Sequence, residues 1–140
     1  MPKFDKPMQL LLDLVTAQTH VQKRVDQHLF LHGISLSEFM VMRSLSLAAD
    51  RSLRRIDLAE QVGLTASGIT RLIAPMEKNN LVTKQANARD ARVSLVKLTD
   101  VGAEIFSDAS TSFKIATQSV FENLTQADLD AVAQAISRLK

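Results

Sequence analysis

Apolar residues recur every three or four positions along most of the chain, which is the spacing of helices that bury one face. The first such stretch follows Pro7 and is expected to end near Gly33, a residue suited to the left-handed end of a helix. Ser35 and Glu38 have the spacing of a capping box, which predicts a second helix through about Ala49. With four Gly and three Pro in 140 residues, the chain is expected to be mostly helical with short connections.

Two shorter helices are predicted in the middle of the chain. The first runs from about Arg55 to Val62, and the second begins after Thr65 as its N-cap and continues towards Asn80. Asn tolerates the left-handed conformation that usually falls to glycine at such an end. Pro75 lies within the second helix and is expected to kink it late in its course.

A β-hairpin is predicted next, followed by two helices. Leu81–Gln85 and Val93–Thr99 are rich in β-branched and aliphatic residues and are separated by a polar stretch, which favours a hairpin with a long tip. Thr99 is expected to cap a long helix, and Thr125 with Asp128 resembles a second capping box before a final helix.

The segment Leu58–Leu72 has the pattern of a helix-turn-helix. Ala59 is small enough for the crossing of two helices, and Gly63, four positions later, can adopt the left-handed turn. The apolar positions of the shared core are filled by Leu58, Val62, Leu64, Ile69 and Leu72. An ordinary helical hairpin needs the same pattern, so this segment alone leaves both interpretations open. A hairpin with a basic tip directly after it favours a winged helix, whose second helix enters the major groove of DNA.

The expected DNA-binding residues come from the start of that second helix and from the hairpin tip. They are Thr65, Ala66, Ser67, Gly68, Thr70, Arg71, Arg89, Asp90 and Arg92. Small residues permit close approach, hydroxyls can hydrogen-bond to bases or phosphates, and arginine suits guanine, phosphate or a narrow minor groove. Asp90 is expected to orient Arg92 through a charge-assisted hydrogen bond, although a surface ion pair of negligible worth is the alternative.

The distribution of charge agrees with a polyanionic partner. Residues 51–97 contain nine Lys/Arg and four Asp/Glu, whereas the rest of the chain contains eight and eleven. A basic middle between acidic flanks is typical of a protein with one face against nucleic acid, although a merely Arg-rich surface gives the same counts.

Composition and motifs exclude several classes of function. The absence of cysteine rules out disulfides, thiolate metal sites and thiol redox switches. The chain has no Gly-x-Ser-x-Gly motif and no phosphate-binding glycine loop, so we expect no enzyme, no catalytic residues and no cofactor. It has neither a signal-peptide pattern nor an apolar run of the ~20 residues that span a membrane, so a cytoplasmic protein without a membrane partner is expected.

The sequence evidence for a small-ligand site or a metal site is weaker than the evidence for DNA binding. A regulatory pocket is expected to involve His20, Arg24, Phe39, Arg43 and Phe113, because a cationic group beside apolar side chains suits an aromatic carboxylate. The same residues are open to core, dimer-contact or surface roles. His28 and His32 have a spacing that can hold zinc, but no third ligand accompanies them, so no metal site is predicted.

Three motifs allow a comparison with a known family. The first is Leu58–Leu64 with Ile69–Leu72, the second is Met76–Val82, similar to LE-x-x-G-L-V, and the third is Asp90–Gly102, similar to D-x-R-x-x-x-V-x-L-T-x-x-G. On these motifs the stretch Ile34–Phe106 resembles the MarR family of bacterial winged-helix regulators. Asn80 stands where the family usually has glycine, and Ala91 where a second arginine is frequent.

The resemblance implies a fold class that is mainly α with a small β-hairpin wing, a winged helix-turn-helix domain plus a helical dimerisation domain. The implied division is an N-terminal dimerisation helix (1–34), a DNA-binding domain (35–99) and C-terminal dimerisation helices (100–140). The amphipathic terminal helices also indicate a dimer, because one compact wing module cannot bury all their apolar faces. Twofold symmetry then predicts a pseudo-palindromic operator with half-sites ~10 bp apart.

The resemblance also implies a transcriptional regulator, commonly a repressor that releases DNA when a small, often phenolic or anionic, ligand binds. Two alternatives stay open: a winged helix that binds protein, and a DNA-binding protein that responds to no ligand. A wing that binds protein has no need for Arg71, Arg89 and Arg92 on one side.

Overall fold

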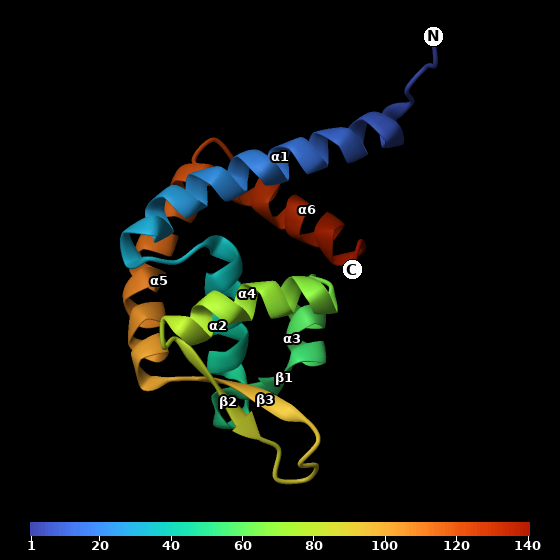
Figure 1. The fold of residues 1–140 in the computed structure, drawn as a ribbon. Coiled ribbons are helices and arrows are strands. Elements are labelled where there is room, and N and C mark those ends of the chain that lie inside the picture. The colour runs from blue at the N-terminus through green and yellow to red at the C-terminus, as the bar shows by residue number, and fades with distance from the viewer.

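A long N-terminal helix and the last two helices lie beside a smaller lobe made of three helices and a sheet (Figure 1). The computed structural model describes every residue from Met1 to Lys140. The elements are α1 (Lys6–Leu29), η1 (Phe30–His32), α2 (Leu36–Leu47), η2 (Ala49–Arg51), β1 (Ser52–Arg54), α3 (Arg55–Val62), α4 (Ala66–Lys78), β2 (Val82–Ala86), β3 (Ser94–Leu98), α5 (Asp100–Val120) and α6 (Gln126–Ser137). The predicted fold class, mainly α with a small hairpin, is confirmed.

Side-chain caps determine where several helices begin. The Ser35 hydroxyl accepts a hydrogen bond from the Glu38 amide, and the Glu38 carboxylate accepts one from the Ser35 amide. Thr125 and Asp128 form the same reciprocal pair in front of α6. Both capping boxes were expected, and each provides partners for backbone N–H groups that the helix itself leaves unpaired.

Left-handed residues end the helices at the expected places. Gly33 follows η1 with φ 74°, and Gly63 follows α3 with φ 72°. Asn80 takes φ 61° after α4, so it does adopt the conformation that glycine would supply. Pro75 lies inside α4, which continues past it to Lys78.

The small sheet contains a strand that the sequence analysis did not predict. Its order is β1-β3-β2, with both pairings antiparallel, so the predicted hairpin strands are joined by Ser52–Arg54. The sequence analysis assigned no strand between the second and third helices, so β1 is an addition to the predicted fold. Three residues are too few to show an alternating pattern, and β1 exists because β3 offers it a free edge on which Leu53 pairs with Val96.

Eighteen buried apolar residues form one core, and no polar or charged residue is buried with them. This core contains the helix-turn-helix positions Leu58, Ala59 and Ile69, as expected. Leu64 departs from the expectation because it is 39% exposed. Its side chain lies over the first turn of α4, beside Gly68, instead of between the two helices.

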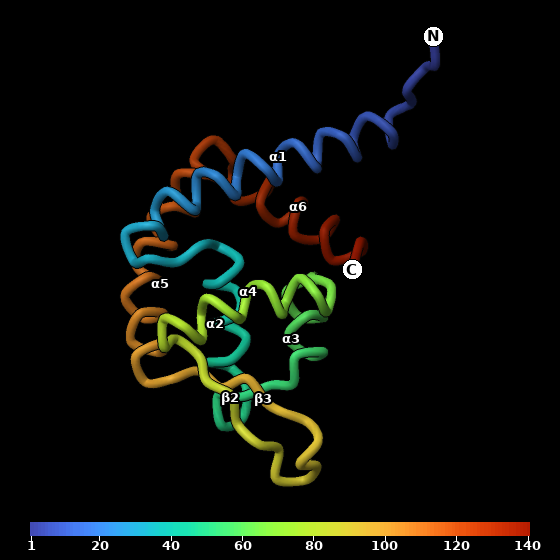
Figure 2. The backbone as a smooth tube through the Cα atoms, viewed as in Figure 1, coloured from blue at the N-terminus to red at the C-terminus, as the bar shows by residue number.

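The terminal helices leave large apolar surfaces without a partner. Every residue of the first half of α1 is exposed, and α6 contributes no buried residue at all. Large exposed apolar side chains include Phe4, Leu10, Leu11, Val15, Val132, Ile136 and Leu139. Figure 2 shows that the N-terminal part of α1 extends beyond the smaller lobe. No helix combines the length and the apolar character needed to cross a membrane.

Gly102 lies at the closest approach between α5 and the base of the hairpin. A Cβ atom at this position would overlap the Leu81 carbonyl oxygen and the Leu98 side chain. Thr99 caps α5 immediately before it, donating to the carbonyl oxygens of Asn80 (2.7 Å) and Leu81 (3.1 Å) and accepting from the Gly102 amide (2.9 Å). The helix, the strand and the turn therefore meet at one tightly packed point.

Gly102→Ala is expected to lower the free energy of unfolding by about 1–3 kcal/mol, because backbone must move to admit the methyl group. The gain in helix propensity, about 1 kcal/mol, is included in that range. Chemical denaturation measures the change, with Ser107→Ala on the exposed side of the same helix as the control. A Gly102→Ala variant as stable as the control would contradict this packing.

Candidate nucleic-acid interface

The first turn of α4 presents unpaired backbone N–H groups and exposed small side chains. Thr65 is the N-cap, and its hydroxyl accepts a hydrogen bond from the Gly68 amide at 3.0 Å. Thr65, Ala66 and Ser67 are all exposed. The positive end of the helix dipole and the free donors make this turn suited to a phosphate group.

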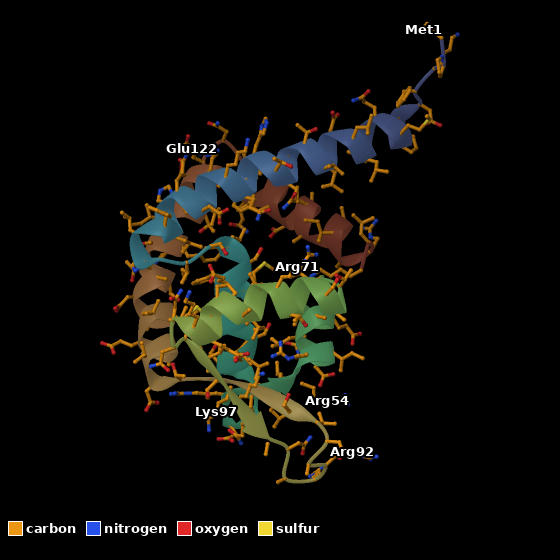
Figure 3. All side chains as sticks on the ribbon, viewed as in Figure 1. Met1, Arg54, Arg71, Arg92, Lys97 and Glu122 are labelled. Carbon is orange, nitrogen blue, oxygen red and sulfur yellow. The ribbon has the colours of Figure 1, made fainter.

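The second turn adds a hydroxyl and a guanidinium to the same surface. Thr70 is exposed, and its hydroxyl donates to the Ala66 carbonyl oxygen at 3.1 Å, so its oxygen remains available as an acceptor. Arg71 is exposed on α4 and takes part in none of the five ion pairs (Figure 3). Its guanidinium is thus free to donate to an external partner.

Gly68 has a local role that the sequence analysis did not identify. A Cβ atom here would lie 3.2 Å from the Thr65 hydroxyl oxygen and 3.6 Å from the Leu64 Cβ. The missing side chain would therefore point back towards the N-cap. Glycine leaves room for the capping hydroxyl, in addition to any benefit for close approach to DNA.

Two side-chain-to-backbone turns shape the tip of the wing, the hairpin Val82–Leu98. The Asn87 carboxamide oxygen accepts from the Arg89 amide at 2.9 Å, and the Asp90 carboxylate accepts from the Arg92 amide at 3.0 Å. The same carboxylate accepts from the Arg92 guanidinium at 3.2 and 3.4 Å, so the expected Asp90–Arg92 hydrogen bond is present. These contacts orient the tip without help from the rest of the fold.

The electrostatics of this pair favour a well-oriented arginine. The side-chain hydrogen bonds from Arg92, followed by the bond from its backbone amide, hold the pKa of Asp90 below its ordinary value. Asp90 is therefore ionised at neutral pH. The Arg92 side chain is 91% exposed even though it is paired, and Arg89 is exposed with no ion pair. Figure 3 shows Arg92 at the far end of the hairpin, where it can reach a partner beside the lobe.

Arg54 is an exposed basic residue that the sequence analysis did not single out. It lies at the end of β1, between α3 and the wing (Figure 3), and its guanidinium donates to both oxygens of Asp57 at 3.0 and 3.2 Å. This bidentate hydrogen bonding raises the pKa of Arg54. The only sequence signal for it was its place in the basic segment, because β1 itself was not predicted.

The five candidate ligand residues do not gather around one cavity. Phe39 is buried, and its ring centroid lies 4.6 Å from that of Phe113 and 4.9 Å from that of Phe106, so these rings pack in the core. Arg24 donates to the carbonyl and hydroxyl oxygens of Ser119, at the end of α5. His20 and Arg43 are exposed and make no side-chain hydrogen bond. None of the three best-formed hollows is lined by any of the five.

The two histidines with zinc spacing have separate partners. His28 Nδ1 lies 3.0 Å from the Arg24 carbonyl oxygen, and His32 Nε2 lies 2.8 Å from the Ser112 hydroxyl oxygen. The structure contains no group of three or more potential ligands that could hold a metal ion.

Comparison with known proteins assigns this architecture to a family. Residues 34–94, which span α2 through the wing tip, match the sequence model of the MarR family. The segment that carries the helix-turn-helix and the wing therefore matches the MarR family. The HTH-type transcriptional regulator MhqR of Bacillus subtilis is 21% identical over 96% of this chain and 92% of its own length.

Solved structures of the family have the same fold over the whole chain. A MarR variant from E. coli complexed with operator DNA superposes with a TM-score of 0.89 at 20% identity, covering 99% of each chain. The Bordetella bronchiseptica regulator BpsR, whose DNA binding is regulated by 6-hydroxynicotinic acid, gives 0.88 at 17% identity, covering 99% of this chain and 97% of its own. The family match and the regulator relatives together indicate a DNA-binding transcriptional regulator and not an enzyme.

Proposed function

We propose that this MarR-family chain is a homodimeric repressor that reads a pseudo-palindromic operator with α4 and the wing and is released by a small aromatic or anionic ligand. The observation that carries the proposal is the joint exposure of Ser67, Thr70, Arg71 and the wing arginine Arg92 on one lobe. Helix side chains suit the major groove, and an arginine at a hairpin tip suits the minor groove beside it.

The terminal helices support the dimer. In a single chain, the exposed faces of α1 and α6 would leave many large apolar side chains in water, which is unfavourable by about 25 cal/mol per Å². A second copy can cover both faces by a twofold contact. We therefore assign residues 1–34 and 100–140 to dimerisation and residues 35–99 to DNA binding. With half-sites about one helical turn apart, ~10 bp, the two α4 helices enter successive major grooves.

Two variants separate the role of the wing from the role of α4. Arg92→Ala should weaken binding to specific and random duplexes alike and lower the slope of log K against log salt by about one per protomer, because a groove contact among phosphates is lost. Ser67→Ala should instead relax sequence preference by ~1–3 kcal/mol at one position per half-site. Titration of labelled duplexes at several salt concentrations measures both effects.

The exposed α5 residue Lys114 supplies the control for these variants, since Lys114→Ala should change neither quantity. A salt slope that Arg92→Ala leaves unchanged would rule out the wing contact. Equal losses of Ser67→Ala on operator and random DNA would mean that Ser67 touches only the backbone of DNA.

The dimer predicts a sharp difference between two faces of α6. A double variant with Val132→Asp and Ile136→Asp should sediment as a monomer at micromolar concentration and lose most operator affinity, because only one half-site can bind at a time. Gln134→Asp, which places one negative charge on the opposite face of the helix, should remain dimeric. Sedimentation of the unaltered chain as a stable monomer at that concentration would refute the dimer.

Release by a ligand is supported by the structural neighbour BpsR, whose DNA binding is regulated by 6-hydroxynicotinic acid. We place the effector near His20, Arg24, Phe39, Arg43 and Phe113, where α1, α2 and α5 meet and a second protomer can complete the site. At least one member of a panel of small aromatic carboxylic acids should weaken operator binding about ten-fold. Arg43→Ala should reduce that effect, whereas Lys23→Ala should not. If every acid leaves binding unchanged, the protein is a DNA-binding regulator that responds to no such ligand.

A further inference from the structure

The turn η2, between α2 and the sheet, has an unusual backbone. Asp50 and Arg51 are consecutive and both left-handed, with φ of 54° and 53°. Asn80 is the one other residue with a side chain that has positive φ. Asp tolerates this region to some extent and Arg poorly, because the Cβ crowds the neighbouring carbonyl group. Such a conformation persists only where surrounding contacts determine it.

Those contacts join the turn to both strands of the wing. One Asp50 carboxylate oxygen lies 3.0 Å from the ammonium nitrogen of Lys97 on β3. The other accepts a hydrogen bond from the carboxamide of Gln85 on β2, at 3.1 Å. We call these two interactions the Asp50 bridge. The hydrogen bonds from Lys97 and then Gln85 lower the pKa of Asp50, so its carboxylate is ionised at neutral pH.

The next residue connects the same turn to the helix after the wing. The Arg51 guanidinium donates to the Asp100 carboxylate at 3.0 Å, in the first turn of α5. A hollow of about 550 Å³ on this side of the sheet is lined by both ion pairs together with Thr83 and Thr99. The strained turn therefore contacts the base of the wing and the start of α5.

The core holds the wing only near its base, where Val82, Val96 and Leu98 are buried, and no residue from 83 to 95 is buried. β1 pairs with β3 over three residues only, Ser52–Arg54, and β2 has no backbone pairing except with β3. The tip is exposed, and its side-chain hydrogen bonds are internal to it. The bond from Gln85 to Asp50 is thus a direct connection between β2 and the helical part of the lobe. Figure 3 shows Lys97 far back along β3 from Arg92, where a small rotation is magnified at the tip.

We propose that Asp50 is a positioning residue for DNA binding: the Asp50 bridge sets the angle of the wing so that Arg92 reaches its groove. The inference rests on the proposed contact of Arg92 with DNA. Stability alone does not account for the arrangement. An exposed ion pair contributes little to the stability of the fold, and the left-handed backbone lowers that stability. A turn selected only for stability would have Asn or Gly at this position.

Asp50→Asn tests the bridge without disturbing the backbone, since Asn readily adopts left-handed φ. We expect the midpoint of thermal unfolding to stay the same or rise, while operator affinity falls about three- to ten-fold. The direction of the change in operator affinity distinguishes two explanations. Removing a negative charge and freeing Lys97 would by simple electrostatics tighten binding to DNA, whereas misdirection of the wing weakens it.

The experiment measures operator affinity for the full chain, for Asp50→Asn, for Arg92→Ala and for the double variant. The Asp50→Asn loss should disappear in the Arg92→Ala background, because the wing then has no contact to misplace. Asp100→Asn, which breaks the other ion pair of the same turn but touches neither wing strand, is the matched control for the loss of charge and should not weaken binding.

Hydrogen exchange of the amides of residues 82–98 supplies a readout that does not involve DNA. It should become faster in Asp50→Asn and not in Asp100→Asn. An Asp50→Asn variant that binds as well as the unaltered chain, or that loses equal affinity with and without Arg92, overturns the positioning role. If Arg92→Ala itself has no effect on DNA binding, the proposed wing contact fails, and unchanged exchange in Asp50→Asn would then separately refute the bridge.

Discussion

The hydroxyl of Thr99 makes the junction on which the arrangement of this molecule depends. It donates to carbonyl groups at the end of α4 and accepts the Gly102 amide at the start of α5, while the Thr99 amide donates to the Leu81 carbonyl oxygen. One side chain therefore joins the residues between α4 and β2 to the start of α5, directly after β3. The absence of a Cβ at Gly102 is what lets these backbones meet.

This junction explains why the short motif L-T-x-x-G is informative. Leu98 is buried in the core, Thr99 caps α5, and Gly102 permits the close approach to Leu81. This junction, together with the packing of α5 on α2, connects the direction of α5 to the positions of α4 and the wing, because packed interfaces move as units. The proposed dimerisation helices and the proposed DNA contacts are thus mechanically adjacent although they are distant in sequence.

Sequence alone was sufficient wherever a local rule determines the backbone. The capping boxes, the glycine between α3 and α4, and Asn80 at the end of α4 all follow from groups within a few residues of each other. The Asp90–Arg92 pair was predictable for the same reason, since the partners are only two positions apart.

Prediction from the sequence failed where a residue distant in the chain determines the local conformation. β1 exists because β3 pairs with it, and the left-handed Asp50 is stabilised by residues 35 and 47 positions away. The stacking of Phe39 on Phe106 and Phe113 of α5 joins residues more than 60 positions apart. Leu64 has the right polarity for the helix-turn-helix core, yet the chain direction after Gly63 turns it over the first turn of α4. None of these contacts has a spacing signature along the chain.

The ion pairs show which basic residues between positions 51 and 97 carry free charge. Of the nine Lys/Arg residues between positions 51 and 97, five are paired with carboxylates. The unpaired ones are Arg71, Lys78, Lys84 and Arg89. Paired arginines such as Arg92 still present exposed N–H groups, but in a fixed direction and with less net charge. Positive charge attracts the phosphates of any duplex, and partly neutralised arginines do so more weakly than unpaired ones. The paired carboxylates therefore lower the attraction of this segment for a polyanion while fixing the directions in which its paired guanidinium groups point.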